Sequence, residues 1–480
     1  MIESQIESKN FIGGEWVPAD SGEVSEIVNP ANPSETLGTT PKSGEAETSR
    51  AIEAAAGAFP SWKATLPSAR GAILSQAADI LESRTDELAQ LMARETGKPM
   101  TEGRAEVARA AAIFRYYGSE GWRMPGVMPP STRPGVQVSS IREPLGVVAL
   151  ITPWNFPLAI PSWKLAPALI CGNAVVIKPA SNASLNAAEL VRALEEAGLP
   201  DGVLNMVTGP GGEVGDALVT DPRVKALSFT GSTSVGLGIQ ERAVGKKVQL
   251  EMGGKNPYVV MEDADLADAA AKVAYGAFGY AGQKCTASSR AIVVEEIYEE
   301  FIEELKNATE AMKLGDPLDD DTVVGPVVNK SQYEDILEAL DQAHEDGRVI
   351  LEGGATEAEG YYIAPSIVTD VDNSSETAQE EIFGPVLAVI RARDFEDAVE
   401  IANDTRYGLT AGIATRSLRY AHEFAERSET GLVNVNLPTA GVEFQVPFGG
   451  NKGSGVGGRE QGMAAMDFYS TWKTVSVRPV

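Results

Sequence analysis

The chain has 480 residues, of which 43% are hydrophobic and 22% are charged, a composition typical of a globular protein, and its length predicts two or three domains. The 68 acidic and 40 basic residues give a formal net charge of −28, so the surface should repel nucleic acid and anionic membranes, and we expect neither as a partner. No apolar run is long enough to span a bilayer, no export signal is visible and only two cysteines are present. Together these features predict a cytoplasmic protein without disulfides.

The acidic residues are spread along the chain rather than gathered in one tail, which is typical of a solvated surface. Two interpretations are open: the hydration-rich surface of a protein from a halophile, and an acidic cytoplasmic protein with no adaptation to salt. We favour the first. The dependence of thermal stability on KCl separates the two, because added salt screens repulsion between surface charges.

Elements follow in order along the chain. Short strands and turns are expected over residues 8–40, and helices over 44–120, where apolar residues recur at helical spacing. From 145 to 253, strands alternate with helices, and the pattern predicts an α/β fold with a doubly wound parallel sheet, the usual dinucleotide-binding platform. The expected strands are 146–151, 174–177, 203–207 and 224–229, and the expected helices are 157–171, 184–197, 212–219 and 234–243. A second α/β region follows residue 254, with strands expected near 257–261, 290–294, 386–391 and 431–436.

Cys285 lies in a segment of mostly small and polar residues, 278–290. A structural cysteine is expected among bulky apolar residues, whereas this thiol is placed where a ligand could reach it, and the adjacent Lys284 could lower its pKa. Cys285 is therefore the candidate nucleophile. The two histidines, His344 and His422, lie in acidic helical segments away from any motif. We therefore expect no zinc or other metal site and no cysteine–histidine pair, and a carboxylate should serve as the general base.

Further candidate residues follow strands of the first α/β region. Glu251 precedes two glycines and is the best candidate for the base, and Asn155 could offer its side-chain amide to an oxyanion. Lys178 ends a buried strand, where ligands bind in open α/β sheets. Gly231 and Ser232 lie at a strand-to-helix junction, where backbone N–H groups can bind phosphate. Each has an ordinary alternative: a solvated loop acid, a helix cap, a surface lysine and a tight turn.

Six motifs taken together resemble the aldehyde dehydrogenase superfamily, in the family's order and over nearly the whole chain. They are Pro153–Pro157, Phe229–Thr233, Leu250–Lys255, Gly282–Thr286, Glu381–Pro385 and Pro447–Gly450. The resemblance implies an NAD(P)-dependent oxidoreductase in which Cys285 attacks the aldehyde carbon. It further implies that Asn155 and the backbone N–H of Cys285 hold the oxyanion. Glu251 would then activate the water that hydrolyses the thioester.

The same resemblance implies a set of cofactor contacts. Lys178 and Glu381 match ribose contacts, and Ser232 beside Gly231 matches a pyrophosphate contact. Trp154 would line the cofactor site, and Phe383 would pack against the nicotinamide ribose. Ser181 stands where many NAD-preferring members carry a glutamate. Because Ser181 is small and neutral, we predict that NADP is accepted and preferred over NAD.

The substrate is predicted from the C-terminal part of the chain. Residues 433–450 and 458–462 resemble the 2-oxoglutarate semialdehyde (2,5-dioxopentanoate) dehydrogenases, with Gln445 and Gly457 as departures. Lys284 and Arg290 are candidates to bind the carboxylate of such a substrate. The alternatives are a succinate semialdehyde dehydrogenase, a broad-specificity aldehyde dehydrogenase and, from another class, a non-catalytic binding protein of the same fold.

The resemblance also implies a division into three parts. A dinucleotide-binding domain would comprise residues 1–123 and 144–253, and a catalytic domain residues 254–453. A small β oligomerisation element would comprise 124–143 and 454–480. Val475 and Val477 alternate there as in a strand that pairs with another subunit, so we expect a homodimer or homotetramer.

Overall fold

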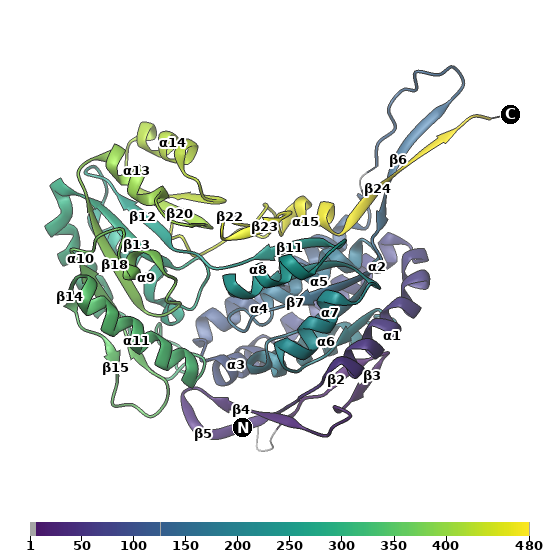
Figure 1. Cartoon of the computed structure of the whole chain (residues 1–480), viewed down its shortest axis with the longest axis horizontal. Coiled ribbons are helices and arrows are strands. Elements are labelled where there is room, and N and C mark those ends of the chain that lie inside the picture. Colours follow the sequence, from purple (N-terminus) through teal and green to yellow (C-terminus); the bar gives the residue numbers. More distant parts are fainter. Residues whose placement is uncertain (1–5, 125, 480) are drawn as a thin grey trace.

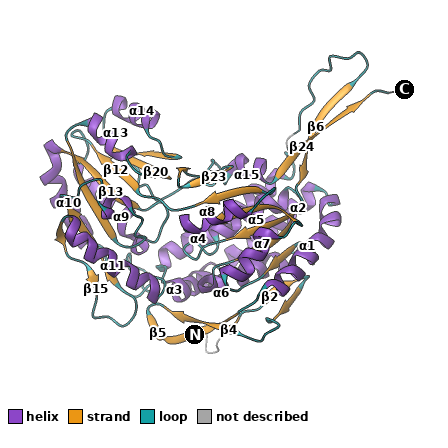
Figure 2. Cartoon of the chain, viewed as in Figure 1, coloured by secondary structure: helices purple, strands orange, loops and turns teal. Residues whose placement is uncertain are grey.

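A computed structural model describes residues 6–124 and 126–479, and two large sheets organise it (Figures 1 and 2). The first sheet has eight strands in the order β23-β11-β10-β7-β8-β9-β2-β3. Its parallel strands are β7 (Val147–Ile151), β8 (Ala174–Lys178), β9 (Leu204–Met206), β10 (Val224–Thr230) and β11 (Lys247–Glu251). Its antiparallel strands are β2 (Asn10–Ile12) and the two edge strands β3 (Glu15–Val17) and β23 (Gly455–Gly457). The strand order reverses between β7 and β10, and ligands bind at such a switch point in doubly wound sheets.

The first sheet is buried on both faces. Alternate residues of β7 and β8 belong to two different hydrophobic clusters, with Val148 and Val175 in one and Ala149 and Val176 in the other. This follows from the two-residue period of a strand, which points successive side chains to opposite faces. The connecting helices are α5 (Ala159–Ile170), α6 (Ser184–Glu196), α7 (Asp216–Thr220) and α8 (Thr233–Arg242). They confirm the predicted alternation.

Four helices precede the first sheet's parallel strands, within the predicted helical region. They are α1 (Glu45–Ala64), α2 (Pro67–Ser83), α3 (Thr85–Thr96) and α4 (Met100–Glu120). α4 packs against α2, α3 and α5. This helix becomes part of the site.

The second sheet has seven strands in the order β14-β17-β18-β13-β12-β20-β21. Only the edge strand β14 runs antiparallel to its neighbour within the described sheet. The strands are β12 (Asn256–Val260), β13 (Ser288–Val294), β14 (Arg348–Leu351), β17 (Ser366–Thr369), β18 (Val386–Ala392), β20 (Thr410–Ala414) and β21 (Leu432–Val435). The helices of this half are α9 (Leu266–Phe278), α10 (Tyr298–Glu310), α11 (Lys330–Asp346), α12 (Glu376–Gln379), α13 (Phe395–Asn403) and α14 (Leu418–Arg427). The four predicted strands of the second region are confirmed.

Smaller sheets complete the molecule. The first is β1 (Ile6–Glu7), β4 (Val24–Asn29) and β5 (Asn32–Pro41), and two short pairs are β15 (Gly354–Ala355) with β16 (Ile363–Ala364) and β19 (Tyr407–Gly408) with β22 (Asn451–Lys452). The last helix, α15 (Gly462–Phe468), is followed by β24 (Ser470–Val477). β24 pairs antiparallel with β6 (Gln137–Pro144), and this two-stranded arm projects from the body (Figure 1). β23 joins the first sheet although its residues fall in the predicted oligomerisation element, and the division into three parts stays a prediction. None of the described helices has the length and apolarity needed to cross a membrane.

Candidate active site

The segment that carries Cys285 is fixed by its neighbours on both sides. After α9, Tyr280 and Ala281 adopt left-handed backbone angles with φ of 57° and 53°, which are costly for residues with a side chain and persist where surrounding contacts impose them. The buried Gln283 accepts a hydrogen bond from the backbone N–H of Val328 at 2.9 Å. Asn256 Nδ2 donates to the Cys285 carbonyl at 2.8 Å. The nucleophile's position is therefore set before any ligand binds.

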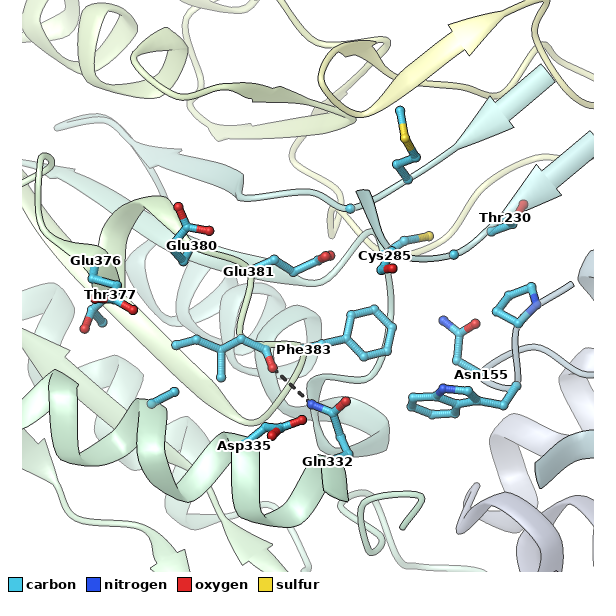
Figure 3. A pocket seen from close by; sticks show the side chains of 18 of the residues that line it. Asn155, Thr230, Cys285, Gln332, Asp335, Glu376, Thr377, Glu380, Glu381 and Phe383 are labelled. Carbon is cyan, nitrogen blue, oxygen red and sulfur yellow. Dashed lines mark hydrogen bonds between the residues drawn. The ribbon is translucent and has the colours of Figure 1, made fainter. Parts of the chain in front are cut away.

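Two cavities, each of about 410 Å³, meet at Cys285. The first lies at the carboxyl ends of β7 and β10 and extends toward α11 (Figure 3). The second lies between α4, α5 and the loop that precedes Phe448. Among the described residues, Cys285 alone belongs to both linings. A thiol in this position can meet one ligand from each side.

The thiol of Cys285 is half-buried and surrounded by acidic groups. Burial raises its pKa to about 12, and the carboxylates of Glu381, Glu251 and Glu460 act in the same direction. These carboxylates raise the pKa because a thiolate beside another negative charge is disfavoured. The resting thiol is therefore protonated at neutral pH, and catalysis needs a group that accepts its proton.

Lys284 does not activate the thiol, contrary to expectation. Its Nζ lies 2.5 Å from Glu102 Oε1 and 4.9 Å from the centre of the Tyr275 ring, and the residue is 5% exposed. The carboxylate of Glu102 neutralises its charge within the wall of the second cavity. Lys284 does line that cavity, so it stays a candidate substrate contact, as half of an ion pair.

Asn155 points at the nucleophile's own loop. Its buried side-chain Nδ2 donates to the carbonyl oxygen of Gln283 at 3.0 Å. Its backbone carbonyl accepts a hydrogen bond from Lys98 Nζ at 2.6 Å. Lys98 is also paired with Glu106, whose Oε1 accepts at 2.9 Å from each of two backbone N–H groups at the start of α5. This buried network holds Asn155 beside Cys285, where the amide can donate to an oxygen bound there.

Glu251 ends β11 and is 3% exposed. Its Oε2 accepts a hydrogen bond from the backbone N–H of Gly450 at 3.1 Å. Burial and the neighbouring Glu460 raise the pKa of Glu251 well above its usual value, while Lys164, which is paired with Glu460, opposes the shift. In this conformation Glu251 lines neither cavity, but its charge acts on the thiol of Cys285. A carboxyl group with a raised pKa is a stronger base than an exposed carboxylate once it has lost its proton.

Glu381, Phe383 and Trp154 come together on the wall of the first cavity. Figure 3 shows Glu381 and Phe383 around the same space as Cys285. Glu381 Oε1 accepts from the backbone N–H of Gly254 at 2.9 Å, and a Cβ at Gly253 would overlap its carboxylate. The rings of Trp154 and Phe383 meet edge to face with centroids 5.6 Å apart. Burial raises the pKa of Glu381 to about 7.

The backbone beside these residues is also constrained. Phe383 adopts a left-handed φ of 55°, which an aromatic residue seldom adopts without support. Support comes from α11, since Gln332 Nε2 donates to the carbonyl oxygen of Ile382 at 3.3 Å, the dashed contact of Figure 3. The Phe383 ring is thereby aimed into the cavity.

Gly231 and Ser232 line the same cavity where β10 meets α8. The N-terminus of α8 presents unpaired backbone N–H groups and the positive end of the helix dipole, which favour a phosphate. The hydroxyl oxygens of Thr230 and Thr233 are buried and have no hydrogen-bond partner among the described residues. A dinucleotide fits this set of groups, which comprises the two unpartnered hydroxyls, the N-terminus of α8 and the carboxylate of Glu381.

Lys178 and Ser181 follow the neighbouring strand and lie outside the lining of the first cavity. Lys178 is opposite Ile151 in the pairing of β7 with β8, so it lies close to the segment that carries Trp154. Its Nζ makes one hydrogen bond, to the Pro179 carbonyl at 3.4 Å, and burial lowers its pKa to about 8. Lys178 is thus a cation beside the first cavity that has no acidic partner within residues 6–124 and 126–479.

Arg290 is not at the substrate cavity, which corrects the expectation for this residue. It is fully buried, and its guanidinium donates to the backbone carbonyls of Lys255, Ile401 and Ala402 at 3.1, 3.0 and 2.9 Å. A further bond goes to Asn373 Oδ1 at 2.9 Å. Its position on β13 directs the side chain into the core of the second sheet, where it ties three segments together.

Arg109 is a lining residue that sequence reasoning missed. Helix α4 presents Glu102, Glu106 and Arg109 to the second cavity. Their spacing of four and three residues places them on one helix face. The sequence did contain a signal for Arg109. Charged residues at helical spacing within the predicted helical region interrupt a face that would otherwise be apolar, and this pattern could have indicated a polar site there.

Comparison with known proteins gives a consistent result. The sequence model of the aldehyde dehydrogenase family matches residues 16–475. The alpha-ketoglutaric semialdehyde dehydrogenase of Bacillus subtilis is 45% identical over the full length of both chains. The alpha-ketoglutarate semialdehyde dehydrogenase of Haloferax volcanii is 46% identical over 98% of each. The crystal structure of an E. coli NADP-dependent enzyme superposes with a TM-score of 0.95, at 37% identity and over 98% of each chain.

Proposed function

Since the chain belongs to the aldehyde dehydrogenase family, we propose that it oxidises 2-oxoglutarate semialdehyde (2,5-dioxopentanoate) to 2-oxoglutarate, using a nicotinamide dinucleotide. The observation that carries the reaction type is Cys285, placed where the two cavities meet. One cavity has the features of a dinucleotide site and the other can admit the aldehyde. The choice of aldehyde is supported by the two relatives named for that semialdehyde, at 45% and 46% identity.

In the first half of the reaction, Glu251 takes the thiol proton of Cys285 and passes it to solvent, and Sγ adds to the aldehyde carbon. The carbonyl oxygen gains the negative charge, and Asn155 Nδ2 and the backbone N–H of Cys285 are the donors placed to hold it. The fixed loop geometry matters because donors that need no rearrangement stabilise the transition state most. A nicotinamide dinucleotide held in the first cavity by Gly231, Ser232 and Glu381 would supply the acceptor for the hydride that leaves this carbon. The substrate is then a thioester on Sγ.

In the second half, Glu251 takes a proton from the water that attacks the thioester, and Sγ leaves as the thiolate. The raised pKa of Glu251 suits this role, since the ionised form of such a carboxyl group binds a proton more tightly than an exposed carboxylate does. To reach the water, the carboxylate must turn from its bond with Gly450 toward the cavities. Covalent capture thereby divides one difficult oxidation into two easier steps.

NADP is the cofactor we favour over NAD. Ser181 carries no charge that would repel a 2′-phosphate, and Lys178 has no carboxylate partner in the described part of the chain. Comparison of kcat/KM for the two cofactors tests the preference, and equal or better values with NAD would refute it. Ser181→Glu should shift activity toward NAD. The control is Ser184→Ala, a substitution three residues further along the chain that introduces no charge.

A second copy of the chain is the partner we propose, in a homodimer or homotetramer. The arm of β6 and β24 exposes Ile141, Trp472 and Val477 at 44%, 46% and 49%. An isolated two-stranded sheet is marginally stable in water, and an open strand edge readily pairs with another chain. Sedimentation of wild type and a Thr474→Pro variant tests this idea. Wild type should sediment as an oligomer and the variant as a smaller species.

The substrate proposal is tested by kcat/KM with NADP for 2,5-dioxopentanoate, succinate semialdehyde and butanal. We expect the first to exceed succinate semialdehyde, and both acids to exceed the neutral aldehyde. A higher kcat/KM for succinate semialdehyde would show that this shorter acid is the preferred substrate. Equal values for all three would refute recognition of a carboxylate. Cys285→Ala should abolish the activity in every case.

A further inference from the structure

The charges around the second cavity are not all paired: its lining has three carboxylates, and one of them, Glu443, contacts Gln445 and no cation among the described residues. Its lining contains two cations, Lys284 and Arg109. Lys284 is bonded to the carboxylate of Glu102, and Glu106 is bonded to Lys98 behind the wall. Both pairs are neutral, so neither can attract an anion strongly.

Arg109 is different, because no carboxylate among the described residues lies within ion-pair distance of it. It donates to neutral oxygens, the backbone carbonyl of Val442 and Gln461 Oε1, the latter at 3.3 Å. Its buried Nε–H has no hydrogen-bond partner in the described part of the chain. A guanidinium has five N–H donors, so several remain for a ligand.

The position of Arg109 is held by packing. Its guanidinium lies 5.8 Å from the centre of the Trp163 ring, and this aromatic residue also lines the cavity. Burial lowers the pKa of Arg109, whereas the carboxylates of Glu106 and Glu443 act to raise it. A half-buried cation without an anionic partner is costly and becomes favourable when an anion binds.

We propose that Arg109 binds the carboxylate at the far end of the substrate while Cys285 captures the aldehyde. This inference rests on the proposed function and assigns its specificity to one side chain. The planar guanidinium matches the two oxygens of a carboxylate and fixes its orientation. Apolar rings of Phe156, Trp163 and Phe444 line the space around it and exclude water that would screen the charge.

The test compares kcat/KM for 2,5-dioxopentanoate and for butanal in wild type, Arg109→Gln and a matched double variant. The double variant, Glu102→Gln with Lys284→Met, removes the other cation together with its partner and so leaves the cavity charge unchanged. We expect Arg109→Gln to lower the ratio of the two kcat/KM values on the order of 100-fold, through loss of charge-assisted hydrogen bonds. The loss should fall on the acid and spare butanal.

In the double variant the ratio should stay within about 3-fold of wild type, a change of less than about 0.7 kcal/mol. If the double variant loses the preference and Arg109→Gln keeps it, Lys284 binds the carboxylate and the inference is wrong. If all three proteins keep the preference, Arg109 is again excluded while the proposed function stands. If wild type shows no preference for the acid, the proposed substrate and the inference fail together.

Arg109→Lys provides a second variant should Arg109→Gln fail to fold. It retains the charge but loses the planar fork, so the ratio should fall by roughly 10-fold and remain above that of the glutamine variant. An unchanged ratio in a folded Arg109→Lys protein would contradict bidentate binding.

Discussion

Asn155 Nδ2 lies 3.0 Å from the backbone carbonyl oxygen of Gln283, two residues before Cys285. One partner follows a strand of the first sheet and the other precedes a strand of the second. The hydrogen bond therefore joins the two halves of the molecule at the nucleophile. It also shows where the amide donor is aimed before a substrate arrives.

Removal of this donor should affect the reaction more than the fold. Asn155→Ala is expected to lower kcat by roughly 100- to 1,000-fold, the usual cost of losing one oxyanion donor. The lost hydrogen bond should lower stability by only about 1 kcal/mol. Steady-state kinetics and a thermal melt measure the two effects. A variant with near-normal kcat would exclude Asn155 from oxyanion binding.

Lys178 should make NADP binding sensitive to pH. Burial lowers its pKa to about 8 in the free protein, and a bound 2′-phosphate would raise it by favouring the charged amine. NADP affinity should therefore be full below pH 8 and weaken as the pH rises above it, while NAD affinity changes less. Titrations of both cofactors between about pH 7 and about pH 9.5 measure this difference. Parallel curves, unchanged in Lys178→Met, would contradict the contact.

Arg290 should matter for stability and not for specificity. Arg290→Met leaves three buried carbonyls without their donor, and we expect a loss of about 2–3 kcal/mol in the free energy of unfolding. The thermal midpoint should fall, whereas the preference for the acid over butanal should not change. A selective loss of activity toward the acid, in a protein with normal thermal stability, would restore Arg290 as a substrate contact.

The acidic surface predicts a response to salt. With a formal net charge of −28, repulsion between surface carboxylates destabilises the compact state, and KCl screens it. The melting temperature should therefore rise with KCl. A steady fall would contradict the halophilic interpretation and favour an ordinary acidic protein.

Much of the fold was predictable because its signals are local. The strands after residue 145 are short apolar runs, and the helices between them are bounded by turns, so the parallel sheet follows from alternation alone. The order of strands within the sheet is set by long-range packing and was not predicted. Glu251 and Asn155 could be chosen because each lies in a motif at or just after the end of a strand, and Cys285 because it lies in a segment of small and polar residues before one.

The charged residues were harder to assign, because sequence shows proximity only along the chain. Lys284 is adjacent to Cys285, yet its charge is neutralised by Glu102 on α4, a residue 182 positions away. Arg290 is directed into a core by strand alternation. Arg109 reaches the cavity from a helix that precedes every motif. Which cation faces the ligand depends on packing between distant segments, and only the structure reveals it.

The covalent role of Cys285 and its release by Glu251 form the central claim, and intact mass measurement of Glu251→Gln tests it most directly. The variant is mixed with NADP and 2,5-dioxopentanoate, with Cys285→Ala as the control. Loss of the base should slow hydrolysis by roughly 100- to 10,000-fold. We therefore predict that cofactor reduction stops after one turnover and leaves an acyl adduct on Cys285. Steady turnover at the wild-type rate, with no adduct, would contradict the account.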